Sequence, residues 1–247
     1  WMVVEADESD GSFLKLPHQI SIITNLDIEH LDYYKSPENL NSAFEQFIKN
    51  LPFYGISIVN EDDKNLKKLI LKNDTRKIIS YSNKNKNVNV CIKEVILLQN
   101  YSEFKLKFNS PINKFSGTHS YKIKAIGLHN IYNATASIIV GLLVGVNNNY
   151  IKSALINNIG VKRRFTHIGK INLSNIYDDY AHHPTEILAT LKGAKQVNKN
   201  IVVVFQPHRY SRTKILFKEF VNVLSKINRL YLLKTYSAGE KKIKGFE

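Results

Sequence analysis

The chain contains 247 residues, of which 43% are hydrophobic and only one is a cysteine. This length suits one large domain or two modest ones, and a single cysteine excludes a disulfide framework. The formal net charge of +14 is typical of nucleic-acid-binding proteins, but the lysines are scattered among asparagines and isoleucines. The sequence also lacks an arginine-rich recognition helix, a zinc pattern and an RNA-binding aromatic motif. A nucleic-acid-binding protein therefore stays only as the alternative from another class, and the charge equally suits an anionic nucleotide substrate.

The apolar segments of the chain do not indicate membrane insertion. The longest of them, residues 136–146, is shorter than the roughly 20 residues that a spanning helix needs. A cytoplasmic protein is expected. Residues 1–5 look like the interior of a buried strand rather than a signal peptide, so we predict that the sequence is a fragment of a longer protein.

The first part alternates short β-branched runs with amphipathic segments, which is typical of an α/β sheet crossed by helices. Ser36 as N-cap, Pro37 as first helical residue and an apolar stripe over residues 40–48 predict one helix. Further helices are predicted at residues 128–144 and 151–158. The predicted strands are residues 19–24, 56–59, 77–81, 88–96, 104–108 and 121–126. The last three alternate between apolar and polar residues, which predicts an antiparallel edge or flap.

A second unit is predicted to begin near Gly160, because residues 160–164 look like an interdomain linker. Strands and helices alternate in it in the order βαβαβ. The strands are predicted at residues 175–178, 201–206 and 230–235, and the helices at about 184–197 and 211–227.

Polar groups are dense after each predicted strand of the second unit. Ligands of an open parallel sheet bind beyond the carboxyl ends of its strands, where loops and helix N-termini converge. A single His-His pair or arginine-rich turn is more often a cap or a surface feature, but three such loops in succession favour a functional site. The three loops are DDYAHH (178–183), QPHRYSR (206–212) and YSAGE (236–240).

The first unit carries acidic loops in the same kind of position. Residues 5–10 (EADESD) and 25–32 (NLDIEHLD) each follow a predicted strand. Carboxylates and a histidine at adjacent strand ends suit Mg²⁺, which takes few protein ligands and bridges nucleotide phosphates. Asp10 and Asp32 suit the capping of a following helix equally well.

Two further segments have both a structural and a functional interpretation. The string GLHNIYN (127–133) opens a helix, where asparagines either cap backbone amides or bind a base edge. Arg163 and Arg164 are either ordinary linker charge or a clamp for a transferring phosphoryl group.

In this order, these strings resemble the Mur ligases, and among them the members that add L-alanine to UDP-N-acetylmuramate. The resemblance covers the whole chain, and the pair DDYAHHPTE and FQPHRYSR is its most specific part. Its segments are ADESD (6–10), TNLDIEHLD (24–32), NLPFYG (50–55), GLHNIYNA (127–134), RRF (163–165), DDYAHHPTE (178–186) and FQPHRYSR (205–212).

The resemblance implies a central ATP- and Mg²⁺-binding domain over residues 1–159, without its beginning. It also implies a truncated Rossmann-like, amino-acid-binding domain over residues 160–247. Each matching position takes a role from the family. The metal would be held or oriented by Glu8 and His30, and the adenine region would contact His129, Asn130 and Asn133. Arg164 would bind the phosphates, and Asp179 would face the nucleotide. The pocket for L-alanine and the reacting carboxylate would be lined by Tyr180, His182, His208, Arg209 and Arg212.

The implied reaction proceeds through an acyl phosphate, in which the muramoyl carboxylate attacks the γ-phosphate of ATP and the alanine amine then attacks the activated carbonyl. Mg²⁺ and arginines such as Arg164, Arg209 and Arg212 stabilise the accumulating negative charge. Either His182 or His208 is a candidate acceptor of the amine proton.

The chain departs from the family in two respects, because it contains no glycine-rich phosphate loop and no counterpart of the domain that binds the UDP moiety. We therefore expect no ligase turnover from these 247 residues alone. A murein tripeptide recycling ligase, which carries a similar DD-aromatic-AHHP string, is the alternative enzyme, and an inactive remnant of either ligase is a third hypothesis. The oligomeric state is not predicted.

Overall fold

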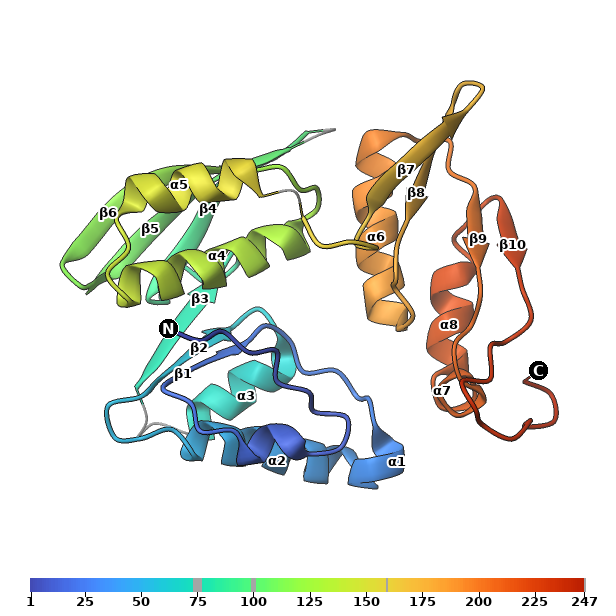
Figure 1. The fold of residues 1–247 in the computed structure, drawn as a ribbon, viewed down its shortest axis with the longest axis horizontal. Helices are drawn as coiled ribbons and strands as arrows, with labels where there is room; N and C mark the ends of the chain where they lie inside the picture. Colours follow the sequence, from blue (N-terminus) through green and yellow to red (C-terminus); the bar gives the residue numbers. More distant parts are fainter. Residues whose placement is uncertain (73–76, 99–100, 159, 247) are drawn as a thin grey trace. The chain divides into compact units, whose positions relative to one another are not determined.

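A computed structural model of the chain describes residues 1–72, 77–98, 101–158 and 160–246, and for Asp32 it describes the backbone only. The chain divides into two compact units. The first consists of Trp1–Ile96, Glu103–Ile123 and Asn130–Ile156, and the second of Leu97–Ser102, Lys124–His129 and Asn157–Glu247. Each unit combines strands with helices, which confirms the predicted α/β class (Figure 1). The domain boundary between residues 159 and 160 stays a prediction, since residue 159 lies outside the described residues.

Within the described residues, the first unit contains a six-stranded sheet in the order β1-β2-β3-β4-β5-β6. Its strands are β1 (Ile20–Ile23), β2 (Ile56–Asn60), β3 (Ile78–Ser82), β4 (Val90–Leu97), β5 (Ser102–Ile112) and β6 (Phe115–Ile123). The first four strands pair in parallel. Between β5 and β6 the two turn residues Asn113 and Lys114 have φ values of 46° and 68°, as a type I′ hairpin requires. Every predicted strand of this sheet has a counterpart, but β5 is longer than the predicted strand 104–108, and β6 begins six residues before the predicted strand 121–126 and ends at Ile123. The two-residue connection makes β5 and β6 antiparallel, as predicted for the flap.

Helices flank this sheet, and their apolar stripes form its core. In α2 (Pro37–Lys49), Ser36 Oγ accepts a hydrogen bond from the Asn39 amide at 3.2 Å and Pro37 takes the first turn, as predicted. The helices α4 (Leu128–Leu143) and α5 (Asn148–Asn157) lie along β4, β5 and β6 (Figure 1). One core cluster gathers Phe13, Ile23, Leu26, Tyr34, Leu40, Ala43, Phe47, Ile48, Leu51, Val59, Leu66 and Leu69. None of the described helices combines the length and hydropathy required of a membrane span.

Three short helical elements of the first unit are absent from the sequence-based prediction. They are η1 (Ser12–Lys15), α1 (Leu31–Tyr34) and α3 (Lys64–Lys72). The start of α3 is capped by Asp63, whose Oδ1 accepts from the amides of Asn65 and Leu66, both at 2.9 Å. Leu66 and Leu69 bury the apolar side of α3, so the lysines that dominate its sequence stay at the surface.

The strand predicted at the beginning of the chain is wrong. Residues 1–8 form neither helix nor strand, and Trp1, Met2 and Val3 are more than four-fifths exposed. Among the described residues β1 pairs with β2 alone, so no neighbouring strand supplies hydrogen bonds to residues 1–4. Apolar, β-branched residues become a strand only where such a partner is present.

The second unit contains two separate two-stranded sheets in its described part. One is an antiparallel hairpin of β7 (Thr166–Ile171) and β8 (Ser174–Asp178), and the other pairs β9 (Val203–Phe205) with β10 (Leu230–Leu232) in parallel. The βαβαβ prediction omits β7 and treats β8 as the first strand of a parallel series. It is wrong for β8, which pairs with β7 in an antiparallel hairpin. Because β7 and β8 adjoin in sequence, the two-residue connection lets them pair locally.

Helix α6 (Pro184–Val197) lies where it is predicted, but the predicted helix over residues 211–227 is divided. It forms α7 (Tyr210–Ile215) and α8 (Phe217–Leu224), separated by Leu216 at φ −102° and ψ 23°. The break lets Leu216 enter the second core, which it shares with Ile187, Leu191, Phe205, Phe220 and Val223. Tertiary packing therefore overrides a continuous helical pattern.

A carboxylate joins the helix α4 to the carboxyl ends of β2 and β3 in the first sheet. Asp62, two residues beyond β2, accepts hydrogen bonds from the Ser82 hydroxyl, from the Asn83 amide at 2.8 Å and from the Tyr132 hydroxyl at 2.6 Å. Burial raises the pKa of Asp62, but these donors outweigh burial and the net shift is downward. The charged form of Asp62 is therefore the one that the fold stabilises.

The Tyr132→Phe variant is expected to lower the free energy of unfolding by about 1.5–3 kcal/mol, because it removes a hydrogen bond to a charged group. The matched control is Tyr81→Phe, since the buried Tyr81 hydroxyl finds no partner among the described residues. The control is expected to be neutral or slightly stabilising. Urea unfolding of both variants measures the difference, and equal losses would contradict this account of Asp62.

Candidate functional site

The two predicted metal-site residues of the first unit lie side by side. The His30 Nε2 atom is 3.8 Å from the Glu8 Oε1 atom. The Tyr34 hydroxyl donates a hydrogen bond to the Glu8 carbonyl at 2.5 Å, so α1 holds the loop that carries Glu8. Burial, followed by the charge of Glu8, raises the pKa of Tyr34 to about 12, so this hydroxyl keeps its proton.

The backbone of His30 has a positive φ. It precedes α1 in the left-handed region, at φ 56° and ψ 34°. A non-glycine residue pays a conformational cost there, and such residues concentrate at functional sites. Ten described non-glycine residues have a positive φ, however, so the conformation of His30 does not by itself indicate a function.

The neighbouring aspartates have local structural roles. Asp7 Oδ1 accepts from the Ser9 amide and Asp10 Oδ1 from the Ser12 amide, each at 2.9 Å. The hydrogen bonds of Ser12 lower the pKa of Asp10. Asp10 thus binds the turn that leads into η1, as the capping interpretation predicts. The side chain of Asp32 lies outside the described residues.

Glu8 and His30 fit a magnesium ion that is also bound by nucleotide oxygens. The described residues contain no group of three or more His, Cys, Asp or Glu side chains gathered as a metal site. Mg²⁺ commonly takes only one or two protein carboxylates and completes its shell with water and phosphate oxygens. One carboxylate with an adjacent histidine is compatible with that requirement, and the roles of Glu8 and His30 at a metal stay a prediction.

The predicted adenine contacts lie in the first two turns of α4. Asn130 and Asn133 are three residues apart, and His129 and Asn133 four apart, so these pairs share a helix face. Gly127 precedes them at φ 88°, and a Cβ atom there would lie 2.8 Å from the His129 ring. Burial lowers the pKa of His129, which favours a neutral imidazole.

In the second unit, Asp179 uses both carboxylate oxygens within the protein. Its Oδ2 atom accepts from the Phe165 amide at 2.8 Å, and its Oδ1 atom from the Ala181 amide at 2.8 Å and the Thr190 hydroxyl at 3.2 Å. Asp179 therefore fastens the two ends of the β7–β8 hairpin to α6. A role toward the nucleotide stays a prediction.

The two adjacent arginines are bound by different carboxylates. Arg163 Nε lies 3.2 Å from Asp178 Oδ2, and its guanidinium carbon lies 4.7 Å from the centroid of the Tyr180 ring. Arg164 Nη1 donates instead to Glu186 Oε1 at 3.1 Å. Both arginine side chains are more than half exposed. The structure thus distinguishes an arginine that packs on the Tyr180 ring from one that is bound by a carboxylate of α6.

The loops after β9 and β10 run side by side and bring together two predicted strand ends. His208 and Tyr236 form a parallel bridge, the Arg209 amide donates to the Tyr236 carbonyl at 2.8 Å, and the two rings are 5.3 Å apart. The His182 ring lies 6.1 Å from the His208 ring, and Arg212 Nη1 donates to the His208 carbonyl at 3.4 Å. Arg209 adopts φ 72° and ψ 132°.

The electrostatic surroundings keep His208 neutral. Burial is the largest cause that lowers the pKa of His208, and the nearby charges of Arg212, His182 and Arg209 lower this pKa further. At neutral pH the imidazole therefore has a free lone pair. That state is the one a proton acceptor needs.

Glu186 is the functional candidate that the sequence-based roles omit, although it ends the string DDYAHHPTE. It accepts from the amides of His182 and His183 at 3.0 and 3.3 Å and completes a capping box with His183 at the start of α6. The signal in the sequence was the spacing of an N-cap residue and a glutamate three positions later. It was missed because histidine is not a usual N-cap.

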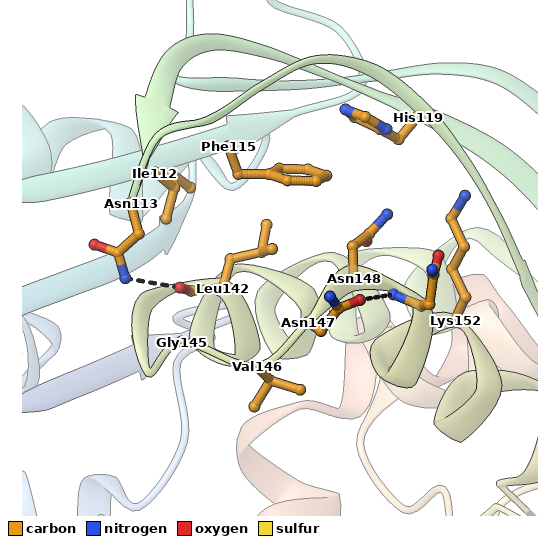
Figure 2. Close-up of a pocket in the computed structure, with 11 residues that line it drawn as sticks. Ile112, Asn113, Phe115, His119, Leu142, Gly145, Val146, Asn147, Asn148 and Lys152 are labelled. Carbon is orange, nitrogen blue, oxygen red and sulfur yellow. Dashed lines mark hydrogen bonds between the residues drawn. The ribbon is translucent and has the colours of Figure 1, made fainter.

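The first unit contains a hollow of about 530 Å³. It opens between the β5–β6 turn and the α4–α5 junction, where Asn148 and Lys152 point from α5 toward Phe115 and His119 (Figure 2). Leu142 forms part of its wall in the last turn of α4, whereas His129 lies in the first turn, about 20 Å along the helix. None of the predicted site residues lines this hollow.

Two family profiles match the chain. The Mur ligase middle domain matches residues 2–141, and the Mur ligase glutamate ligase domain matches residues 163–244. The chain therefore belongs to the Mur ligase family, and the resemblance inferred from its motifs is confirmed.

Among the similar curated proteins are enzymes named UDP-N-acetylmuramate–L-alanine ligase. The one from Pelagibacter ubique is 42% identical over 249 residues, which cover 100% of this chain and 53% of that protein. The one from Gluconobacter oxydans is 38% identical over 247 residues, covering 99% and 52% respectively. The chain thus spans about half the length of the curated relatives it matches.

Solved structures agree with this assignment. The UDP-N-acetylmuramate-alanine ligase MurC of Thermotoga maritima has a TM-score of 0.68 and 27% identity, covering 92% of this chain and 54% of that one. MurF of Acinetobacter baumannii has a TM-score of 0.73 over 90% of this chain and 48% of its own. Its identity is 20%, so it shows the fold alone.

Proposed function

We propose that this chain is the nucleotide- and amino-acid-binding part of an ATP-dependent ligase that joins L-alanine to UDP-N-acetylmuramate. The observation that carries the proposal is the 42% identity to such an enzyme over the whole chain. The proximity of His182 to His208 and Arg209 in the second unit supports the proposal. These residues belong to two loops that are distant in the sequence, and the fold brings the loops together.

In the first half-reaction the muramoyl carboxylate attacks the γ-phosphorus of ATP and ADP leaves, which produces an acyl phosphate. Arg164 would bind the phosphoryl oxygens, and His129, Asn130 and Asn133 would bind the base. Mg²⁺, held through Glu8 and oriented by His30, would neutralise phosphate charge. The protein contributes mainly position and electrostatic stabilisation, as is usual in phosphoryl transfer.

In the second half-reaction the alanine amine attacks the acyl carbon, phosphate leaves and the amine loses a proton. His208 is the better supported proton acceptor, because burial and Arg212 lower its pKa and leave it neutral. Arg209 and Arg212 would bind carboxylate oxygens, while Tyr180 and His182 would line the amino-acid pocket.

The alternative enzyme, a murein tripeptide recycling ligase, shares the fold. The murein peptide ligase of Psychrobacter arcticus has a TM-score of 0.61 at 20% identity, which is a likeness of fold only. The two functions differ in the incoming substrate, since one adds a free amino acid and the other a tripeptide.

The test is a chimera in which these 247 residues replace the matching segment of the Pelagibacter ubique relative. The flanking parts of the relative then supply the rest of its length, of which the matching segment makes up 53%. We expect the chimera to release phosphate from ATP only when UDP-N-acetylmuramate and L-alanine are both present. The isolated 247 residues are expected to release none.

A chimera that melts cooperatively but uses murein tripeptide in place of L-alanine would establish the recycling function instead. A folded chimera that turns over neither substrate would identify an inactive remnant. Melting followed by circular dichroism separates these outcomes from a failure to fold.

A further inference from the structure

Glu186 lies at the centre of the hydrogen bonds that start α6. Its Oε2 atom accepts from the His182 amide at 3.0 Å and from the His183 amide at 3.3 Å, and it lies 3.8 Å from His182 Nδ1. Its Oε1 atom accepts from Arg164 Nη1 at 3.1 Å. One side chain therefore binds both an expected phosphate ligand and the backbone of an expected substrate contact.

We infer that Glu186 is a positioning residue, which holds the Arg164 guanidinium and the His182 backbone in the arrangement that the ligase reaction uses. The inference rests on the proposed function for the roles of Arg164 and His182. A guanidinium carries five N–H donors, so the bond through Nη1 leaves several for phosphoryl oxygens. Fixing one end of a long, half-exposed side chain reduces the conformational entropy that Arg164 must lose on binding a substrate.

The charge of Glu186 is part of this arrangement. Burial alone raises the pKa of its carboxyl group, but the His182 amide, the His182 charge and Arg164 together lower it below its usual value. At neutral pH Glu186 is therefore ionised and can form a charge-assisted hydrogen bond with Arg164. A neutral side chain of the same shape would keep the amide contacts and weaken the arginine contact.

Glutamine is such a side chain, and this separates the proposal from a purely structural role. The third position of a capping box accepts either Glu or Gln, because both present a side-chain oxygen to the backbone amides. The Glu186→Gln variant should therefore keep the start of α6 while releasing Arg164. The matched control is Glu219→Gln, in the first turn of α8, which changes the same charge at a helix start outside the site.

The first measurement is turnover of the chimera described above. Glu186→Gln is expected to lower kcat about tenfold or more, because a catalytic group misplaced by about 1 Å can cost up to about 100-fold. Its melting temperature should stay within about 3 °C of the parent. Glu219→Gln should change neither quantity. In an Arg164→Ala background, Glu186→Gln should change kcat less than about twofold, because the two residues act through one contact.

The second measurement does not depend on activity. In the 247-residue chain, NMR titration of the Glu186 carboxyl group should show its pKa rise when Arg164 is replaced by alanine. Wild-type kcat in Glu186→Gln, or an equal loss in the Arg164→Ala background, would overturn the proposal. An unchanged Glu186 pKa would overturn it as well. If the folded parental chimera shows no turnover but the Glu186 pKa rises as expected, the proposed function is refuted. The contact between Glu186 and Arg164 is then still established.

Discussion

Replacement of Arg164 by alanine in the chimera is expected to lower kcat by about 10²–10³-fold, the usual effect of removing a preorganised donor from a developing anion. The KM for L-alanine should change little, because Arg164 is proposed to bind the phosphoryl group rather than the amino acid. Phosphate release at saturating L-alanine and UDP-N-acetylmuramate measures the effect. Arg164→Lys should recover only part of the rate, because an ammonium group lacks the planar fork of donors.

The adjacent arginine provides the matched control. Arg163 has the same charge and exposure but is bound by Asp178 and lies over the Tyr180 ring. The Arg163→Ala variant is expected to lower kcat less than about tenfold, with its main effect on the KM for L-alanine through Tyr180. If both alanine variants lose kcat equally, the distinction between the two arginines is wrong.

Replacement of Arg209 by glycine is expected to abolish most turnover and yet to cost less stability than replacement by alanine. Arg209 adopts φ 72° and ψ 132°, a backbone conformation that glycine reaches without steric cost. Both variants remove the guanidinium, so kcat/KM for L-alanine should fall about 100-fold or more in each. The glycine variant should be about 1 kcal/mol more stable than the alanine variant, because only alanine keeps a Cβ atom at positive φ.

Urea unfolding of the two variants in the 247-residue chain measures this difference. The backbone hydrogen bonds of residue 209 to Tyr236 and Thr213 are available to both variants, so they cancel in the comparison. An alanine variant as stable as the glycine variant would show that Arg209 does not hold a strained backbone. A glycine variant with wild-type turnover would remove Arg209 from the site.

Local sequence determined the features whose partners lie within a few residues. The cap of α2 by Ser36 was predictable, because a capping bond joins residues two or three positions apart. The bounds of α6 were predictable from its sequence, which begins with Pro184 at a favoured first helical position. The polar loops after the strands were predictable for a related reason, since strand ends can be read from the apolar pattern. The family motifs depend on order along the chain and needed no coordinates.

Contacts between distant residues decided the rest. Residues 1–4 have a strand-like composition but no pairing partner in the described sheet, and β8 pairs with β7 rather than with the parallel strands. The break at Leu216 follows from its place in the second core. Glu186 reaches Arg164 across 22 positions of sequence, so no local pattern pointed to that contact.

By itself, the sequence determined the class of fold and the family, and it predicted the residues that would carry chemistry, because these depend on residue type, order and short spacing. The tertiary structure alone decided which of those residues touch and which carboxylate holds which arginine. The physical reason is that pairing, burial and ion-pair geometry depend on groups that meet only after the chain has folded.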